Sequence, residues 1–598
     1  MISLPTFQGT ASSASDVPVL DLNFAGPNGF FATKGVTPTL TRGSVATYTD
    51  SAGVLRTTNS NIILQSNVFT ASPWTTNGTT VALTTGTTSP DLSLNAFELK
   101  DTVTSGPHAF YQIPTGSVAG PYTLSLYVKK SGKRYIGVAY TGILQGTSIF
   151  DTELGIFTQT DAAHTVSVIS ASNGWYRFVI RTQAASAEGP IGLTLFMTLT
   201  GTSAGIPSYT GDGTGIYIYG VQFEQASYAG PYSPTTTAAT NNGPRIDYDP
   251  VTLACKGLLI EEARTNLFLQ SNNFADAYWT KSGVTLANAP GIISPDGGTN
   301  STLITVTAVN ADGVSRLLSG PTGGTYSIYI KRNVGSYISI WTASDNSSAC
   351  QFNISTNTIV SLGISNESAS VTPINNGWVR LSVTRKVSAG SSNSCFFAFL
   401  NSSAVIGDNH YIYGAQVEQG AFLTSYIPTT TAAVTRNAES CYLSGTAFSS
   451  WFNASEGTFV VNARIGNIAT SFPTILVASD GGILTNNLRV IQSANLATIG
   501  ADAWTSSSQI ANFESSYSID SLFKVGLAYK VNNFAGCFNN GTVSMDVSGA
   551  VPTGINQLLI GSGYSTSSPT SAQIKTTFSR IRYYNKSLPN LNLKKTTV

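Results

Sequence analysis

The chain has few charged residues for its length. Lysine, arginine, aspartate and glutamate make up 10% of its 598 residues, whereas soluble domains usually carry about 25%. The formal net charge is +1, and no block of basic residues occurs. Nucleic acids and acidic lipid surfaces are bound largely through positive charge, so the sequence argues against both as the main partner. Contacts with a partner would instead depend on shape, hydrogen bonds and aromatic side chains.

Cysteine and histidine are also scarce. The five cysteines are widely spaced and form no Cys-x-x-Cys pair, and the three histidines are His108, His164 and His410. We therefore expect buried free thiols, no metal site and no cofactor, although a bridge between Cys350 and Cys395 within one repeat stays open. None of the histidines stands near a nucleophile motif such as Gly-x-Ser-x-Gly, so we expect no catalytic residues.

Long apolar runs are missing. No stretch of 18 apolar residues occurs, and residues 1–5 lack the basic start and apolar core of a signal peptide. The sequence therefore predicts no membrane insertion, with synthesis and folding inside a cell.

What the chain does have is a duplication of roughly 170 residues. Leu-Gln-Ser-Asn at residues 64–67 precedes Trp74, and the same tetrapeptide at residues 269–272 precedes Trp279 at the same offset. Each copy closes with Tyr-Ile-Tyr-Gly and a Pro-Thr-Thr-Thr-Ala-Ala tract. The chain is therefore modular.

Short β-branched and aromatic runs bounded by Gly, Asn, Ser or Pro dominate the sequence, and no long helical periodicity occurs. This predicts an all-β fold with two tandem jelly-roll β-sandwiches and a third sandwich of another type. The predicted units are an N-terminal segment (1–60), repeat 1 (61–235), a connector (236–265), repeat 2 (266–430) and a C-terminal unit (431–598).

Alternation in the closing strand of repeat 1 predicts a core face and a polar face. The core face would hold Tyr217, Tyr219, Val221 and Phe223, with Gln222 and Glu224 opposite.

Two recurrent pairs need a separate interpretation. Trp175 and Trp378 recur at equivalent positions, which favours core packing over sugar stacking. Glu224 and Glu418 also recur, but no second carboxylate accompanies them consistently, as a glycosidase would require.

Other charged residues are interpreted as local structure. Asp91 and Asp296 follow a proline, where turn chemistry is favoured over a structural calcium site. Glu261, Glu262 and Arg264 are close in sequence, and we expect a local turn in which Arg264 contacts a carboxylate or carbonyl. The alternative is an ion pair between subunits.

The order of several motifs resembles that of tailed-bacteriophage virion proteins over nearly the whole chain. In one respect the chain departs from the usual layout. The motifs at residues 42–48 and 244–250 are normally close together, and here repeat 1 separates them, as though a copy had been inserted. The motifs are Leu-Asp-Leu-Asn-Phe-Ala (20–25), Leu-Thr-Arg-Gly-Ser-Val-Ala-Thr-Tyr (40–48), Gly-Val-Leu-Arg (53–56), Pro-Arg-Ile-Asp-Tyr-Asp-Pro (244–250) and Gly-Leu-Leu-Ile-Glu-Glu-Ala-Arg-Thr-Asn-Leu (257–267).

This resemblance implies carbohydrate-binding-module-like jelly rolls and a C-terminal concanavalin- or laminin-G-like sandwich. It implies a non-enzymatic tail fibre or related virion appendage, commonly a homotrimer, with other virion proteins and host surface polysaccharide as partners. The N-terminal segment would attach to the virion or pack against a later domain. Two alternatives stay open: a capsid decoration, head fibre, baseplate or adaptor protein that binds no glycan, and a polysaccharide depolymerase tailspike.

If sugars are bound, loops in which the two copies differ should carry the specificity. The candidate ligand-binding residues are then Trp341, which has no counterpart in repeat 1, and Trp504 and Tyr517 of the C-terminal unit. Aromatic side chains at such positions more often belong to a core.

Overall fold

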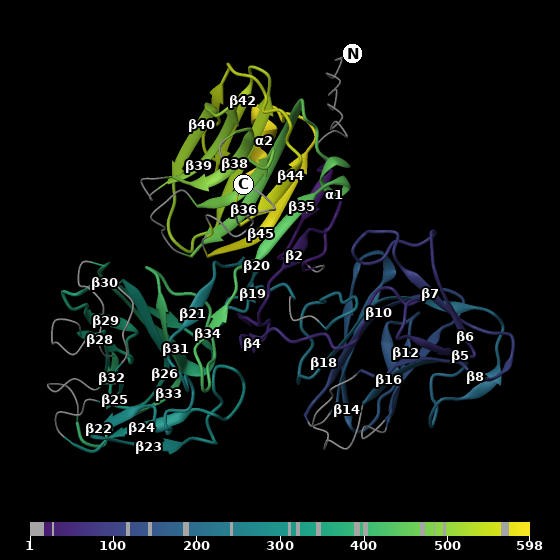
Figure 1. Ribbon diagram of the computed structural model, residues 1–598, viewed down its shortest axis with the longest axis horizontal. Helices are drawn as coiled ribbons and strands as arrows, with labels where there is room; N and C mark the ends of the chain where they lie inside the picture. Colours follow the sequence, from purple (N-terminus) through teal and green to yellow (C-terminus); the bar gives the residue numbers. More distant parts are fainter. Residues whose placement is uncertain are drawn as a thin grey trace, which may run out of the picture.

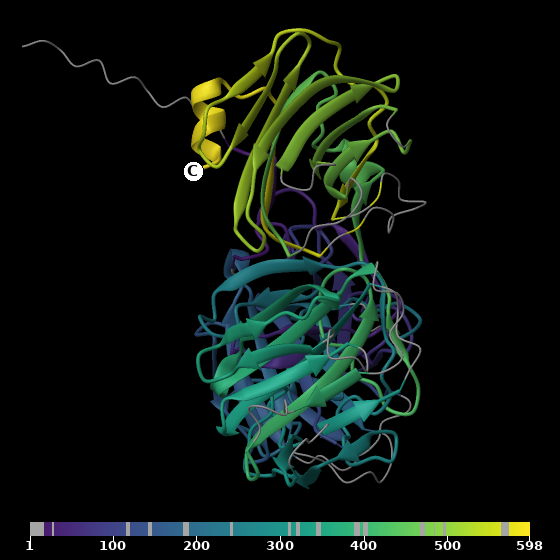
Figure 2. The same ribbon diagram turned by 90° about the vertical axis from the view of Figure 1, so that its left-hand side faces the viewer.

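The computed structural model places three β-sandwiches around a common centre. In Figure 1 the first jelly roll lies at the lower right, the second at the lower left, and the third sandwich above them; the view turned by 90° also places the third sandwich above (Figure 2). The structure describes residues 17–26, 29–114, 120–141, 146–182, 191–239, 243–308, 313–317, 323–342, 349–387, 395–398, 405–466, 473–482, 485–493, 498–561, 563, 573 and 575–598.

The first jelly roll packs two six-stranded sheets against each other. Buried aliphatic and aromatic side chains from both sheets fill the space between them. One sheet has the order β14 (His164–Ser170), β15 (Tyr176–Thr182), β10 (Thr123–Lys130), β18 (Gly215–Glu224), β7 (Phe97–Asp101) and β6 (Thr79–Leu83). The other has the order β13 (Ile156–Gln159), β12 (Thr147–Asp151), β11 (Tyr135–Thr141), β16 (Gly192–Thr198), β9 (Ala109–Gln112) and β5 (Thr75–Asn77).

The second jelly roll repeats this topology strand for strand, as the duplication predicts. Its first sheet has the order β30 (Asn366–Pro373), β31 (Trp378–Arg385), β26 (Gly324–Val334), β33 (Asn409–Gln419), β24 (Thr302–Val306) and β23 (Val284–Asn288). Its second sheet has the order β29 (Thr358–Ser361), β28 (Ala349–Asn353), β27 (Tyr337–Trp341), β32 (Cys395–Ala398), β25 (Gly313–Arg316) and β22 (Thr280–Ser282).

The third sandwich takes strands from three separate stretches of the chain. The N-terminal segment and the connector supply β1, β2, β19 and β20, and the C-terminal unit supplies the rest. One sheet contains β19 (Ile246–Tyr248), β20 (Cys255–Ile260), β45 (Thr576–Tyr584), β36 (Glu456–Ile465), β41 (Phe523–Lys530), β42 (Phe534–Phe538) and β43 (Ser544–Asp546), with β1 (Leu20–Leu22) also on β45. The other contains β2 (Thr39–Thr41), β35 (Ser440–Ser444), β44 (Gln557–Ile560), β37 (Thr474–Ser479), β38 (Asn487–Gln492), β39 (Thr498–Thr505) and β40 (Ser508–Ser516).

Short elements complete the described chain. No helix among the described residues is long and apolar enough to cross a membrane. The paired short strands are β3 (Thr47–Thr49) with β4 (Leu55–Thr57), β8 (Ser105–Pro107) with β17 (Ser208–Thr210), and β21 (Arg264–Asn266) with β34 (Val434–Arg436); the helical segments are α1 (Thr446–Ser449), α2 (Asn590–Thr596) and the 3-10 turns η1 (Ser172–Gly174) and η3 (Asn375–Gly377).

Each jelly roll is closed by one asparagine where the chain enters it. The Nδ2 group of Asn61 donates to the carbonyl oxygens of Val221 and Ser233, which belong to the closing strand and the exit of repeat 1. Asn266 makes the equivalent pair of hydrogen bonds in repeat 2. The chain therefore enters and leaves each jelly roll at one place, so the rest of the fold can continue past it.

The alternation predicted for the closing strand is confirmed for Val221 and Phe223 and is wrong for Tyr217 and Tyr219. Ile216, Ile218, Val221 and Phe223 face the core, whereas Tyr219 belongs to a separate aromatic cluster on the other face of the sheet. A β-bulge causes the change, because the pairing of β10 with β18 shifts register between Ser125–Gln222 and Tyr127–Tyr219.

A glycine makes this bulge possible in each copy. Gly220 and Gly414 have φ angles of 60° and 61°, where a Cβ atom is strained. A Cβ on Gly220 would also lie 3.1 Å from Cζ of Tyr232. The bulge therefore turns tyrosines outward and leaves room for them to pack closely.

Other core predictions are confirmed. Trp175 and Trp378 are 0% and 1% exposed, and their indole nitrogens donate to the carbonyl oxygens of Thr88 and Ile293. Among the cysteines, Cys350, Cys441 and Cys537 are buried free thiols and Cys255 is half-buried. The side chain of Cys395 lies outside the described residues.

Five buried charged side chains join the three sandwiches. Glu439 contacts the guanidinium groups of Arg42 and Arg245, both through Oε1, at 2.8 and 2.7 Å. Glu261 binds Arg245 and Arg436 through Oε2 at 2.7 and 2.9 Å. All five side chains are at most 1% exposed, and we call them the arginine–glutamate cluster.

The cluster also reaches both jelly rolls. Arg42 donates to the carbonyl oxygen of Gly243, beyond the exit of repeat 1, and Ser425 of repeat 2 donates to Glu261 through its backbone N–H and its hydroxyl. The predicted local contact of Arg264 is confirmed, because it pairs with Glu262. The role of Glu261 in the cluster was not predicted.

Replacing Glu439 by alanine should destabilise the full chain strongly. Removing one partner of a buried ion pair leaves the other charge desolvated and typically costs about 3–5 kcal/mol. We expect a lower midpoint of urea-induced unfolding. As a control, Glu153→Ala removes the partner of Lys130 in an exposed pair and should cost at most about 1 kcal/mol. Equal midpoints for the two variants would contradict the structural role of the cluster.

Candidate functional site

The three aromatic residues predicted from sequence do not form a common site. Trp341 ends β27 of the second jelly roll and is half-buried. Trp504 lies opposite Gln509 at one end of the β39–β40 hairpin, and Tyr517 follows Ser516 at the other end. At about 3.3 Å per residue, these two side chains are separated by roughly 20 Å.

Trp504 and Tyr517 each make a side-chain hydrogen bond within the C-terminal unit. The indole nitrogen of Trp504 donates to Asp502 at 3.0 Å, and the guanidinium of Arg489 lies 5.2 Å from the ring centre. The Tyr517 hydroxyl accepts a hydrogen bond from Gln492 at 2.6 Å. Burial raises the pKa of Tyr517 to about 12.

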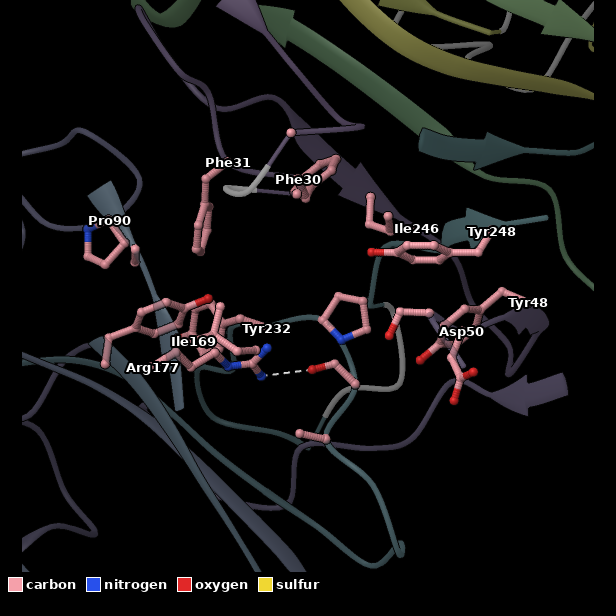
Figure 3. Close-up of a pocket in the computed structure, with 18 residues that line it drawn as sticks. Phe30, Phe31, Tyr48, Asp50, Pro90, Ile169, Arg177, Tyr232, Ile246 and Tyr248 are labelled. Carbon is pink, nitrogen blue, oxygen red and sulfur yellow. Dashed lines mark hydrogen bonds between the residues drawn. The ribbon is translucent and has the colours of Figure 1, made fainter. Parts of the chain in front are cut away.

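A better candidate is a cavity of about 410 Å³ between the first jelly roll and the centre of the molecule. Phe30 and Phe31 lie on one side of it, with Arg177 and Tyr232 opposite, and Tyr48, Asp50 and Tyr248 close a third side (Figure 3). We call it the aromatic pocket. Its volume lies in the range of about 300–1,000 Å³ that is usual for small-ligand sites.

The floor of the aromatic pocket is the outward face created by the bulge at Gly220. Tyr127, Tyr219 and Tyr232 pack edge to face there, with ring centres 5.7 to 6.2 Å apart. Phe31 lies 5.8 Å from Tyr127 and 6.3 Å from Tyr232. The N-terminal segment therefore supplies a half-buried ring to a surface formed by residues far along the chain.

One arginine provides the positive charge of this pocket. The Nη2 group of Arg177 donates to the Ser125 hydroxyl at 2.8 Å and to the Gly230 carbonyl at 2.7 Å, and the guanidinium lies 5.5 Å from the Tyr127 ring centre. Among the described residues Arg177 forms no ion pair with a carboxylate. Arg177 is 8% exposed.

The pocket also carries a carboxylate and two phenols. Asp50 accepts hydrogen bonds from the Val54 backbone and from Arg56. Burial, with a smaller effect of Cys255, raises the pKa of Tyr248 to about 12, and burial also raises the pKa of Tyr48. Both phenols therefore keep their protons at neutral pH.

Each recurrent glutamate accepts a hydrogen bond from a residue whose carbonyl oxygen binds the arginine of the same jelly roll. The Gly230 N–H donates to Glu224 at 3.0 Å while its carbonyl accepts from Arg177. In the second jelly roll Thr424 takes the place of Gly230, between Glu418 and Arg380. Neither glutamate lines the aromatic pocket, and the two belong to different sandwiches.

Asp91 and Asp296, which follow a proline in each copy, accept hydrogen bonds from groups in their own jelly roll. Asp91 accepts hydrogen bonds from the Ser93 N–H and the Tyr219 hydroxyl; Asp296 accepts from the Gly298 N–H. Among the described residues no group of three or more His, Cys, Asp or Glu side chains comes together.

His164 lies 2.8 Å from the Ser148 hydroxyl, but Ser148 is fully buried and substrate cannot reach it.

Sequence reasoning missed the residues of the aromatic pocket. Tyr127 and Arg177 recur as Tyr329 and Arg380, but recurrence at equivalent positions also fits a purely structural role. Tyr48 ends the motif at residues 40–48 and Tyr248 lies within the motif at residues 244–250, but neither motif indicates a pocket by itself. The contribution of Phe31 had no local signal.

Comparison with solved structures gives likenesses to parts of the chain. No family model matches the chain, and no curated protein matches it. Similar solved structures include the CBM40 of Ruminococcus gnavus IT-sialidase bound to α2,3 sialyllactose (10% identity, TM-score 0.23, 27% of this chain and 93% of that chain). Domain 4 of AbnA, a GH43 extracellular arabinanase from Geobacillus stearothermophilus, in complex with arabinotriose is similar too (8% identity, TM-score 0.22, 30% and 83%). At these scores neither likeness assigns a ligand or an activity to this chain.

The stability of the chain should depend on the ionisation of Glu224. Burial raises the pKa of this carboxyl to about 7, against hydrogen bonds from Gln222 and Gly230. The folded state thus favours the protonated form, and its contribution to stability is complete below the ordinary pKa near 4.5 and lost as the pH rises through 7. At about 1.4 kcal/mol per tenfold change in proton affinity, the loss between pH 5 and pH 8 is roughly 2–3 kcal/mol.

The matched variant is Glu224→Gln, which cannot ionise. Urea unfolding at pH 5 and pH 8 should show wild type losing roughly 2–3 kcal/mol more than E224Q over this interval. Parallel pH dependence of the two proteins would show that Glu224 is charged in the folded state.

Proposed function

We propose that this protein binds glycans without catalysing a reaction, and that the aromatic pocket holds a sugar ring. The observation that carries the proposal is the lining of the pocket: ring faces of Phe30, Phe31 and Tyr248 beside the polar groups of Arg177 and Asp50. A pyranose has apolar C–H faces and a rim of hydroxyl groups. Aromatic faces suit the former, and a few fixed donors and acceptors suit the latter.

We further propose that the protein is a tail-fibre-type appendage of a tailed bacteriophage. The motif order in the sequence supports this, and so does the meeting of two of the motifs in space. The Thr49 N–H, next to the motif at residues 40–48, donates to Asp247 of the other motif at 2.9 Å. Motifs that are usually close in sequence are thus adjacent here, with the first jelly roll inserted between them. Host surface polysaccharide and other virion proteins would be the partners of a homotrimer made in the host cytoplasm.

Two rival functions make different predictions. A purely structural virion protein would bind no polysaccharide. A depolymerase would release reducing ends from polysaccharide, and replacing Glu224 or Glu418 would abolish that release. Truncation of residues 431–598 is a poor test, because β1, β2 and β20 pair with strands of that unit.

Loss of the two half-buried rings should weaken glycan binding. We expect F30A/Y248A to raise the dissociation constant for an oligosaccharide identified on a glycan array by about tenfold or more, a loss of at least about 1.4 kcal/mol. The measurement is isothermal titration with protein whose thermal midpoint shows that it is folded.

The matched controls are Y337A, which removes a 37% exposed ring from β27 outside the pocket, and the variants W341A and W504A. Unchanged affinity in the controls, with loss in F30A/Y248A, supports the pocket. Loss confined to W341A or W504A would contradict it and would return the site to the loops predicted from sequence.

The virion assignment has its own test. Gold-labelled antibodies against the folded chain should decorate one end of purified phage particles from a strain that carries the gene. Decoration distributed over the capsid would favour the structural alternative, and absence of the chain from particles would contradict a virion role.

A further inference from the structure

The second jelly roll presents an equivalent floor to a second cavity. This cavity, of about 430 Å³, is lined by Tyr329, Arg380 and Tyr426, which are the counterparts of Tyr127, Arg177 and Tyr232. The Arg380 guanidinium lies 5.0 Å from the Tyr329 ring centre and donates to Ser327 and Thr424. The duplication therefore produced two floors with the same chemistry.

The walls of the two cavities differ. Where Phe30 and Phe31 cover the aromatic pocket, the third sandwich and its connector strands supply Lys256, Arg464 and Lys575 to the second cavity. Seven of its 22 lining residues carry charge, whereas two of 18 do in the aromatic pocket and 10% do in the whole chain. We call this cavity the ionic pocket.

Positive charge in the ionic pocket is only partly neutralised. Arg464 donates to the backbone carbonyl of Asp520 at 3.0 Å, and within the described part of the chain neither Arg464 nor Arg380 forms an ion pair. Lys256 lies 3.6 Å from Asp249, at the long end of an ion pair.

Asp247 and Asp520 are the other carboxylates that line this cavity. Asp247 accepts a hydrogen bond from the Thr49 N–H at 2.9 Å, and burial raises the pKa of its carboxyl. Asp520 is exposed, where solvent screens its charge. A guanidinium and an ammonium facing one cavity recognise carboxylate and phosphate groups.

We propose that the ionic pocket binds an anionic sugar, through a carboxylate or phosphate group held by Arg464 and Lys256 while the ring rests on Tyr329 and Tyr426. This inference rests on the glycan-binding function proposed above and adds a second subsite of different specificity. Tyr48 lines both cavities, so the two subsites adjoin each other at this residue. An acidic polysaccharide with neutral units could occupy both.

Three sugars that share one hexose skeleton test the proposal. Glucose, glucuronate and glucose 6-phosphate differ only at C6, and saturation-transfer NMR with the full chain at low ionic strength reports the binding of each. We expect glucuronate, glucose 6-phosphate or both to give a stronger signal than glucose. That excess should disappear at high ionic strength and in the variant K256Q/R464Q. Which acid binds identifies the anionic group.

The matched control K130Q/R332Q removes the same two charges from exposed positions outside the pocket and should leave the signals unchanged. Acidic sugars that bind no better than glucose, or that bind equally to K256Q/R464Q, would overturn the ionic pocket. Different results would contradict glycan binding by the aromatic pocket: a glucose signal that survives in F30A/Y248A, or no binding of any sugar.

Discussion

The arginine–glutamate cluster is the constraint on which the rest of the architecture depends. Its members come from the N-terminal segment, the connector and the start of the C-terminal unit, so the cluster can form only when these distant stretches meet. Burying charge is costly unless the charges are paired, and here each guanidinium lies against at least one carboxylate. Hydroxyl and backbone carbonyl oxygens accept further hydrogen bonds from Arg42 and Arg245. The cluster therefore specifies one arrangement of three sandwiches. The walls of both pockets are fixed by that arrangement.

Duplication followed by different surroundings gives one fold two cavities with different walls. Each jelly roll is closed at its base by an asparagine and turns tyrosines outward through a glycine bulge, so both copies offer the same aromatic floor. Their neighbours differ, because Phe31 of the N-terminal segment covers one floor whereas Arg464 of the third sandwich faces the other. The proposed subsites would place specificity between sandwiches, and the loops at which the copies differ would not be needed for it.

Local sequence signals were sufficient for the fold class, the tandem jelly rolls and the burial of Trp175 and Trp378, because strand periodicity and repetition are local or internal to the chain. They were insufficient for features that depend on pairing with a residue far away in the sequence. The bulge at Gly220 depends on pairing with β10, so the side chains beyond it change face. Leu20 pairs with Tyr583 across the length of the chain, and no periodicity in either segment indicates this. Residue type alone points to Trp504 and Tyr517, and it cannot reveal that they lie at opposite ends of a hairpin.

The central claim is that sugars bind where a jelly roll faces the shared centre of the molecule. The most direct measurement is a crystal structure of the full chain with an oligosaccharide selected for binding in solution. The account predicts electron density for a sugar ring between Phe31 and Arg177, with a charged sugar of the same chain beside Arg464. Density confined to the outer loops of the sandwiches, with both pockets empty, would contradict it.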